Sequence, residues 1–302
     1  MPSWQARLAG AVVRTAIRRR DWGNGPALAR RARRLLGAPP IVRLLHRARR
    51  PGIRVTPVVD GAIRGEWVES HRADQGALLY IHGGGFVCCS AASHRPIAGA
   101  LAQLTGRRVF SADYRLAPEH PFPAAIDDVV AAYQWLISQG FPASAIVIAG
   151  DSAGGNLTLS GLVRIRDAGL PLPARAACFS PWTDLTGSGA SVLGNDGRDA
   201  MFRPENMAAF SEVYLAGASR QNPAASPLFA ALGGLPPLLF QVGSTELLLD
   251  DSTRVHEAIL RVGGESELQV FDDVVHCWQM FDGWVPEART ALQKAAAFLH
   301  PV

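Results

Sequence analysis

The amino-acid sequence predicts an α/β fold with a mostly parallel central sheet and helices on both of its faces. Short apolar runs alternate with helical stretches along the chain, and this alternation is typical of parallel sheets. One junction between a predicted strand and a predicted helix reads Gly150-Asp151-Ser152-Ala153-Gly154. The first two strands are separated by Asp60-Gly61, which favours a hairpin and therefore an antiparallel start to the sheet.

The chain is long enough for one large α/β domain with an accessory segment, since it has 302 residues and is 48% hydrophobic. We expect a central sheet of eight strands near residues 53–59, 63–69, 77–82, 108–112, 145–149, 175–179, 237–242 and 267–271. Helices are expected near residues 94–105, 123–139, 153–168, 252–262 and 286–299. No apolar run approaches the roughly 20 residues that a membrane-spanning helix needs.

The serine between glycines is a candidate nucleophile. A strand at 145–149 runs directly into Ser152, and an apolar-rich helix follows it. This is the setting of a nucleophile elbow, in which a sharp turn lifts the serine hydroxyl out of the sheet. Gly150 and Gly154 fit the same turn, because a Cβ at either position would collide with a neighbouring strand or helix. The alternative is a glycine-rich turn that only caps a helix.

A second glycine motif follows the strand at 77–82 and favours the catalytic interpretation. Gly83, Gly84 and Gly85 stand in a row after His82. Backbone N–H groups reach an oxyanion only where no side chain blocks the approach, and a His-Gly-Gly-Gly loop is known to supply such donors. We therefore predict an oxyanion hole made by the N–H groups of Gly84, Gly85 and Ala153.

These motifs together resemble a known family. The chain carries His-Gly-Gly-Gly-Phe at 82–86, Asp-Tyr-Arg-Leu-Ala-Pro-Glu-His-Pro-Phe-Pro at 113–123 and Gly-Asp-Ser-Ala-Gly-Gly-Asn at 150–156. With Ser-Pro-Trp-Thr-Asp-Leu at 180–185, it resembles the hormone-sensitive-lipase-like esterases of bacteria over about residues 55 to 300. The resemblance implies an α/β-hydrolase fold with a helical cap, hydrolysis of carboxylic esters, a preference for short acyl chains, and no metal or organic cofactor. It also implies that the protein pairs as a homodimer through an edge strand.

A serine nucleophile needs a histidine base, and in α/β-hydrolases the base follows the acid in the chain. His276 comes on a loop after the strand at 267–271, which is where this fold presents its base. His256 falls within a predicted helix and His300 almost at the C-terminus, so neither suits the role. We predict His276.

The acid is expected on the turn after the strand at 237–242. Many relatives carry Asp-Pro-Leu at this turn, whereas the first carboxylate here is Glu246. We predict Glu246, since glutamate is a known variant of the triad acid on this fold. Asp250 is the alternative, although an acidic residue in a first helical turn usually serves the helix dipole.

The four cysteines, Cys88, Cys89, Cys178 and Cys277, have neither the C-x-x-C spacing nor a zinc pattern. We interpret them as free thiols of a cytoplasmic protein and predict no metal site.

The N-terminal segment is strongly basic. Residues 1–54 hold fourteen of the 30 basic residues and one of the 26 acidic ones, so they carry +13 while the remainder carries −9. We expect residues 1–52 to form a helical cap segment, with one helix beginning near Trp4 and another over 27–36. The alternatives are contact with an anionic membrane, or binding of nucleic acid, which we do not expect.

The rest of the cap is expected from an insertion near residues 185–226 within a catalytic domain that spans 53–302. Residues 204–216 suit one helix, placed between two strands where this fold accepts a lid. Phe86, Trp182, Met201 and Phe202 are the predicted lining of the substrate pocket.

The sequence thus predicts a serine carboxylesterase that acts on small to medium, short-chain acyl esters through an acyl-enzyme, with Ser152, His276 and Glu246 as its triad. An amidase, peptidase or deacetylase on the same triad is one alternative. A non-catalytic ligand-binding protein of the same fold is another, and the presence of His276 argues against it.

Overall fold

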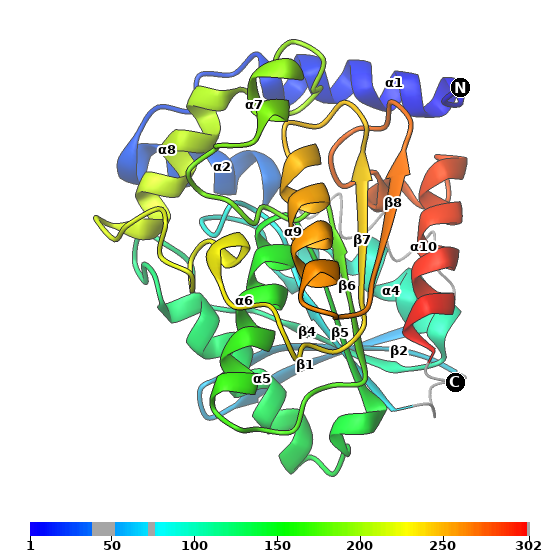
Figure 1. Ribbon diagram of the computed structural model, residues 1–302. Helices are drawn as coiled ribbons and strands as arrows, with labels where there is room; N and C mark the ends of the chain where they lie inside the picture. The colour runs from blue at the N-terminus through cyan, green and yellow to red at the C-terminus, as the bar shows by residue number, and fades with distance from the viewer. Residues whose placement is uncertain (38–51, 72–75, 301–302) are drawn as a thin grey trace.

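The computed structural model describes residues 1–37, 52–71 and 76–300, and its centre is one eight-stranded sheet (Figure 1). The strands are β1 (Ile53–Asp60), β2 (Ile63–Ser70), β3 (Ala77–Ile81), β4 (Arg108–Ala112), β5 (Ile146–Asp151), β6 (Arg175–Phe179), β7 (Leu238–Gly243) and β8 (Ser266–Phe271). Their order is β1-β2-β4-β3-β5-β6-β7-β8. β1 and β2 form the predicted antiparallel hairpin and β2 is antiparallel to β4, while all other pairs are parallel. The predicted fold class is confirmed.

The helices fall into two layers and a group at one end of the sheet. They are α1 (Trp4–Val13), α2 (Gly25–Leu36), α4 (Arg95–Thr105), α5 (Ala124–Ser138), α6 (Ala153–Asp167), α7 (Ala190–Gly194), α8 (Pro204–Leu215), α9 (Leu249–Arg261) and α10 (Pro286–Leu299). A π-helical turn, η1 (Arg14–Arg18), extends α1, and short 3-10 turns occur at η2 (Ala91–Ser93), η3 (Ala143–Ala145), η4 (Pro227–Phe229) and η5 (Trp278–Phe281).

The sheet is buried on both faces, which explains why its central strands are continuous apolar runs. All residues of β3, β5 and β7 are buried. Helices α5, α6 and α9 share one hydrophobic core with one face, and α4 and α10 pack with the other. The parallel strands therefore all end at the same edge, where the loops that follow β3, β5, β7 and β8 come together.

Above that edge lie α1, α2, α7 and α8, as Figure 1 shows. Helix α2 packs against α8, although the two are far apart in the chain. The buried face of α1, made by Ala6, Ala9 and Val13, shares a small core with the start of α10. The part of the predicted N-terminal segment at 38–51 lies outside the described residues. No helix within the described ranges is long and apolar enough to cross a bilayer.

Candidate active site

The turn between β5 and α6 holds Ser152 in a conformation that side chains rarely adopt. Its φ is +54° and its ψ is −120°. A Cβ on Gly150 would lie 2.3 Å from the carbonyl oxygen of Gly154, and a Cβ on Gly154 would lie 2.0 Å from that of Ile81. Both glycines are therefore required by the close packing of helix and strands, as the sequence indicated.

Ser152 is fixed by its backbone, and no hydrogen bond holds its hydroxyl within the described residues. Its N–H donates to the carbonyl of Phe179 at 2.8 Å, and its carbonyl accepts from the N–H of Trp182 at 3.2 Å. The residue is 6% exposed, and it lines a cavity of about 820 Å³. Because it precedes the first turn of α6, its hydroxyl lies near unpaired helix N–H groups, which favour negative charge.

His276 lines the same cavity as Ser152 and is anchored by only one of its ring nitrogens. Its Nδ1 lies 2.6 Å from Oε2 of Glu246. Its Nε2 is buried and has no hydrogen-bond partner among the described residues. The structure thus brings Glu246 to His276, whereas the carboxylate of Asp250 accepts the N–H of Ser191 at 2.9 Å.

The second oxygen of the Glu246 carboxylate is also held. Oε1 accepts the hydroxyl of Ser180 at 2.7 Å and the N–H of Gly243 at 2.6 Å. These bonds fix the orientation of the carboxylate towards the ring of His276. Ser180 was not predicted from the sequence, although it directly follows β6 at the same sheet edge. Its place directly after the apolar run at 175–179 is the sequence signal that could have identified it, and the structure gives it a positive φ of 45°.

Burial and charge act in opposite directions on His276. Burial alone would lower the pKa of this imidazole, but the Glu246 carboxylate favours the protonated ring and raises its pKa above 6.5. The pair therefore stabilises an imidazolium inside the protein, which is the state that a general base reaches during catalysis.

The glycine loop after β3 faces the same cavity. Gly84 and Gly85 both line it and have positive φ values of 115° and 58°. A Cβ on Gly84 would lie 2.2 Å from the carbonyl oxygen of Cys88, so only glycine fits there. Within the described part of the chain, no hydrogen bond uses the N–H of Gly84 or Gly85. Ala153 begins α6, and the N–H of a first helical residue has no acceptor within its helix.

A buried polar network lies beneath the nucleophile and ties the two loops together. Asp151 accepts the hydroxyl of Tyr80 at 2.6 Å, the N–H of Gly83 at 3.0 Å and Nε2 of His94 at 3.2 Å. Asp151 therefore has a structural role, and His94 was not predicted as a site residue from the sequence. Burial opposes both charges, yet the pKa of His94 is raised to about 9 beside Asp151, and the pKa of Asp151 is lowered to about 2 beside His94. The two groups form a buried ion pair.

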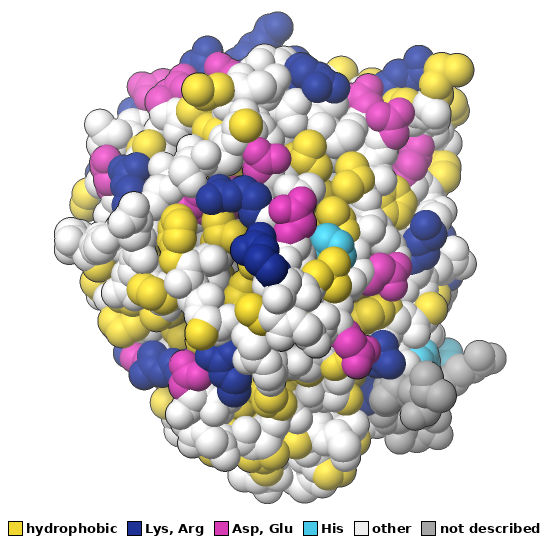
Figure 2. Space-filling view, viewed as in Figure 1, with side chains coloured by type: hydrophobic (Ala, Val, Ile, Leu, Met, Phe, Trp, Pro, Cys, Tyr) yellow, Lys and Arg dark blue, Asp and Glu magenta, His cyan; other side chains and the backbone are white. Residues whose placement is uncertain are grey.

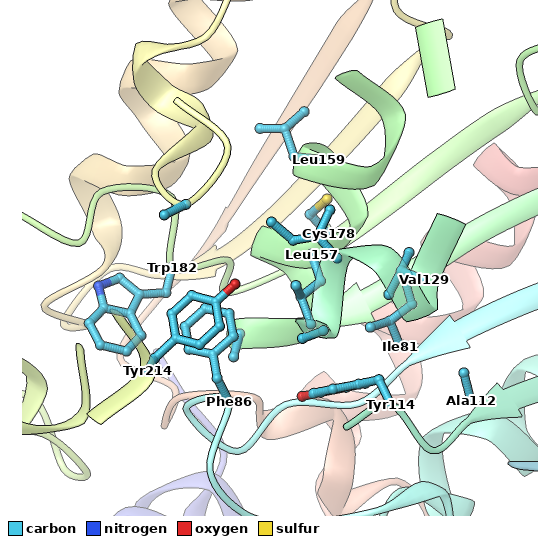
Figure 3. Close-up of a cluster of buried hydrophobic side chains, with 14 of the residues drawn as sticks. Ile81, Phe86, Ala112, Tyr114, Val129, Leu157, Leu159, Cys178, Trp182 and Tyr214 are labelled. Carbon is cyan, nitrogen blue, oxygen red and sulfur yellow. The ribbon is translucent and has the colours of Figure 1, made fainter. Parts of the chain in front are cut away.

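The predicted pocket lining needs one correction. Trp182, Met201 and Phe202 line the cavity, but Phe86 does not. The Phe86 ring is fully buried and stacks on Tyr214, with centroids 3.8 Å apart, as Figure 3 shows. The chain turns at Phe86 with a φ of +66°, and its side chain packs under α8 as part of the core.

Asp199 is a further site residue that was not predicted from the sequence. Its carboxylate accepts the N–H groups of Met201 and Phe202 at 2.6 and 2.9 Å and that of Leu247 at 2.8 Å. Asp199 therefore joins the cavity wall to the loop that carries Glu246. The Phe202 ring in turn packs edge-on against His276, with centroids 4.7 Å apart.

Three other histidines and acids of the chain have partners of their own. Nδ1 of His256 pairs with the hydroxyl of Ser266 at 2.8 Å. Glu119 forms an ion pair with Arg33 of α2, and His82 stacks on Tyr114, with centroids 4.3 Å apart. These side chains hold loops in place around the site.

Comparison with known proteins agrees with this arrangement. The chain matches the α/β hydrolase fold family over residues 78–280. It is 43% identical to an acetyl-hydrolase of Streptomyces hygroscopicus over 80% of this chain and 81% of that protein. It is 37% identical to an esterase of Acinetobacter venetianus over 82% of each chain.

Solved structures give the same result at the level of the fold. The crystal structure of an esterase from the bacterial hormone-sensitive lipase family superimposes with a TM-score of 0.89 at 37% identity, covering 99% of this chain and 98% of that one. EstE5 soaked with p-nitrophenyl butyrate gives a TM-score of 0.89 at 36% identity over 98% of each chain.

The fold and the match over residues 78–280 define an α/β hydrolase. Within that class the chain belongs to the bacterial hormone-sensitive lipase family, and it is a carboxylic-ester hydrolase.

Proposed function

We propose that the protein hydrolyses small to medium esters of short-chain acids by two acyl transfers through Ser152. Nε2 of His276 accepts the Ser152 proton as Oγ attacks the ester carbonyl carbon. The protonated ring then donates that proton to the departing alcohol, and an acyl-enzyme remains. Water then attacks the carbonyl carbon of the acyl-enzyme, with His276 again as the general base. The acid and free Ser152 are released. All of these steps use protein groups and water.

The observation that carries the proposal is the asymmetry of His276. Its Nδ1 is engaged by Glu246 at 2.6 Å, while its Nε2 is buried without a partner in the described chain and shares a cavity with Ser152. A buried ring nitrogen without a hydrogen-bond partner costs stability, so its presence in the folded protein indicates a function. Here it is the atom that a serine nucleophile requires, with the tautomer set by Glu246.

The charge that develops on the carbonyl oxygen also has a candidate binding site. The N–H groups of Gly84, Gly85 and Ala153 are unpaired within the described residues. Gly84 and Gly85 line the same cavity as Ser152, and Ala153 directly follows it. Each such donor contributes about 3–4 kcal/mol to transition-state stabilisation. We propose these three groups as the oxyanion hole.

The size and lining of the cavity support an ester of moderate length. A volume of about 820 Å³ lies in the range of small-molecule sites, and Trp182, Met201 and Phe202 make part of its wall apolar. One relative is an acetyl-hydrolase and another was soaked with p-nitrophenyl butyrate. We therefore propose acyl groups from acetyl to hexanoyl as the preferred class.

A panel of p-nitrophenyl esters from acetate to laurate tests this proposal, with matched p-nitroanilides as the amide control. We expect kcat/KM to be highest between acetate and hexanoate and to fall for longer chains. Anilides should react at least about 100-fold more slowly because their leaving group is poorer. A maximum at laurate would overturn the short-chain assignment, and faster anilide hydrolysis would indicate an amidase.

The surrounding segments complete the proposal. Residues 1–52 and the insertion near 185–226 act as the cap that covers the cavity, since Val13, Trp22, Met207 and Phe210 all contribute to its wall. The remainder of 53–302 acts as the catalytic domain. A homodimer is proposed from the family resemblance. A cytoplasmic location is proposed from the four cysteines, all of which are free thiols.

A further inference from the structure

The outer face of α1 carries large apolar side chains in contact with solvent. Trp4 is 63% exposed, Leu8 47% and Val12 56%. These residues are four apart, so they form one stripe along the helix. Large apolar side chains rarely gather in this way on a surface that stays in water. The opposite face of α1 is already buried by Ala6, Ala9 and Val13, so the stripe is not needed to hold the helix in place.

Arginines lie on α1 and beyond the end of the stripe, since Arg7 is within α1 and Arg19 and Arg20 follow η1. Arg7, Arg19 and Arg20 are exposed, and no ion pair joins them to an acid within the described residues. Figure 2 shows Lys and Arg side chains along the upper edge of the molecule, where α1 runs in Figure 1, with acidic side chains among them. The surface of α1 therefore combines an apolar stripe with arginines that have no acidic partner within the described residues.

A cationic hollow continues the surface from the end of η1 to α2. It has a volume of about 410 Å³, and Arg20, Arg31 and Arg34 contribute to its wall. Asp21, which also lines the hollow, lies 3.6 Å from Arg31. Trp22 and Leu35 line both this hollow and the catalytic cavity, so the two spaces adjoin.

The catalytic cavity also reaches the surface close to the N-terminal end of α1. Trp284 lines the cavity and is 39% exposed. It lies three residues before Glu287, whose carboxylate accepts the N–H and hydroxyl of Ser3 at 2.6 and 2.8 Å. The bonds between Ser3 and Glu287 thus place the N-terminal end of α1 close to the segment of the cavity wall that contains Trp284.

We propose that α1 is an interfacial helix that docks the enzyme on an anionic phospholipid surface. Trp4, Leu8 and Val12 would enter the boundary between headgroups and acyl chains, while Arg7, Arg19 and Arg20 contact lipid phosphates. A nucleic acid would use the arginines but leave the stripe exposed to water. A second copy of the chain would bring arginines against arginines. Only a surface that is both apolar and anionic complements the whole face.

Vesicle co-sedimentation of the full-length protein tests the proposal. We expect binding to vesicles containing phosphatidylglycerol and little binding to phosphatidylcholine alone. The triple variant Trp4→Gln, Leu8→Gln, Val12→Gln should lower the partition coefficient at least about tenfold, since glutamine retains helix propensity. The matched control Val59→Gln, Leu260→Gln, Val262→Gln removes three comparably exposed apolar side chains of β1 and of the end of α9 and should leave binding unchanged.

Two further measurements separate loss of lipid docking from misfolding and from loss of catalysis. The triple variant should hydrolyse soluble p-nitrophenyl acetate at the wild-type rate, which shows that it is folded. Ser152→Ala should still bind vesicles, so loss of docking is distinguishable from failure of the esterase proposal. The proposal is overturned if vesicles do not bind, if both lipids bind equally, or if the triple variant binds like wild type. It is also overturned if gel filtration shows that the stripe mediates a dimer, or if duplex DNA abolishes vesicle binding at stoichiometric concentration.

Discussion

The edge of the sheet and the cap above it are held together by different kinds of contact. At the sheet edge, Ser152, His276 and Glu246 are all at most 6% exposed and are bound to other buried groups. In the cap, the arginines of η1 and α2 reach partners near the surface, such as Asp196 for Arg18 and Glu119 for Arg33.

This difference predicts how the two regions respond to substitution. A hydrogen bond between buried charged groups is strong and costly to break. An exposed ion pair contributes only about 0–1 kcal/mol because water screens it. Single changes at the sheet edge should therefore abolish catalysis, whereas single changes of exposed charges in the cap should have little effect on it.

The largest effect is expected at the nucleophile. Ser152→Ala should lower kcat for p-nitrophenyl acetate by about 10⁶-fold, the scale seen when a serine nucleophile is lost. Ser160→Ala is a matched control, because Ser160 is a buried serine on α6, the helix that follows Ser152, and its hydroxyl donates to Asn156 at 3.3 Å. It should change kcat less than about threefold. Comparable turnover by the Ser152 variant would remove Ser152 from the mechanism.

The next test separates the two candidate acids. Glu246→Gln keeps the shape of the side chain, but the Ser180 hydroxyl and the Gly243 N–H would hold its amide oxygen. The amide NH2 would then face Nδ1 of His276 and favour the wrong tautomer, so kcat should fall about 10³- to 10⁴-fold. Asp250→Asn loses only part of a bond to the N–H of Ser191 and should cost less than about threefold. Steady-state kinetics on both variants decide the assignment, and the opposite pattern would make Asp250 the acid.

The pH dependence should follow from the same pair. His276 acts as a base only when neutral, so kcat/KM should rise with pH through its pKa, which lies above 6.5. In Glu246→Gln the carboxylate that stabilises the imidazolium is gone, and burial then lowers the pKa. The acid limb of the residual activity should therefore move to lower pH. An unmoved limb would mean that another group controls it.

Most of the candidate catalytic residues at the sheet edge could be predicted from the sequence, because short motifs of neighbouring residues define them. Ser152 and the glycines around it occupy consecutive positions, and backbone sterics dictate their residue types. Glu246 and His276 are each on the loop after a strand, and parallel strands bring such loops together. The fold class was predictable for the same reason, since each strand and helix has its own periodicity.

The site residues that were not predicted act over long sequence distances. His94 meets Asp151 57 positions away, and Asp199 meets Leu247 48 positions away. A local sequence pattern does not say which residues of two distant segments will come into contact. Phe86 was predicted to line the pocket, but the direction of its side chain depends on packing against Tyr214 of α8. The direction of such a side chain is set by packing between elements that are distant in the chain, and the periodicity of the sequence does not predict it.

A smaller effect, on stability, is expected from the buried His94–Asp151 pair. The pKa of His94 is raised to about 9 from 6.5 in the unfolded chain, so its stabilising contribution is complete below pH 6.5 and is lost as pH rises through 9. A shift of this size corresponds to about 3 kcal/mol. The free energy of unfolding should therefore differ most between wild type and His94→Gln near pH 6, and least near pH 9.5. Urea unfolding at both pH values measures this, and a difference independent of pH would show that His94 is uncharged.

The smallest effect is expected in the cap, at Glu119. Its carboxylate pairs with Arg33 at 2.6 Å, but its side chain is 56% exposed, so solvent screens most of the attraction. Arg33 also donates to the carbonyls of Val87 and Ala117 at 2.8 and 2.9 Å, and these bonds remain in Glu119→Gln. Unfolding free energy should therefore fall by less than about 1 kcal/mol, and kcat/KM should change less than about twofold. Arg33→Gln, which removes all of these bonds, should cost more than Glu119→Gln in the same urea titration. Equal losses would mean that the exposed ion pair alone attaches α2, and the contrast between the sheet edge and the cap would then be wrong.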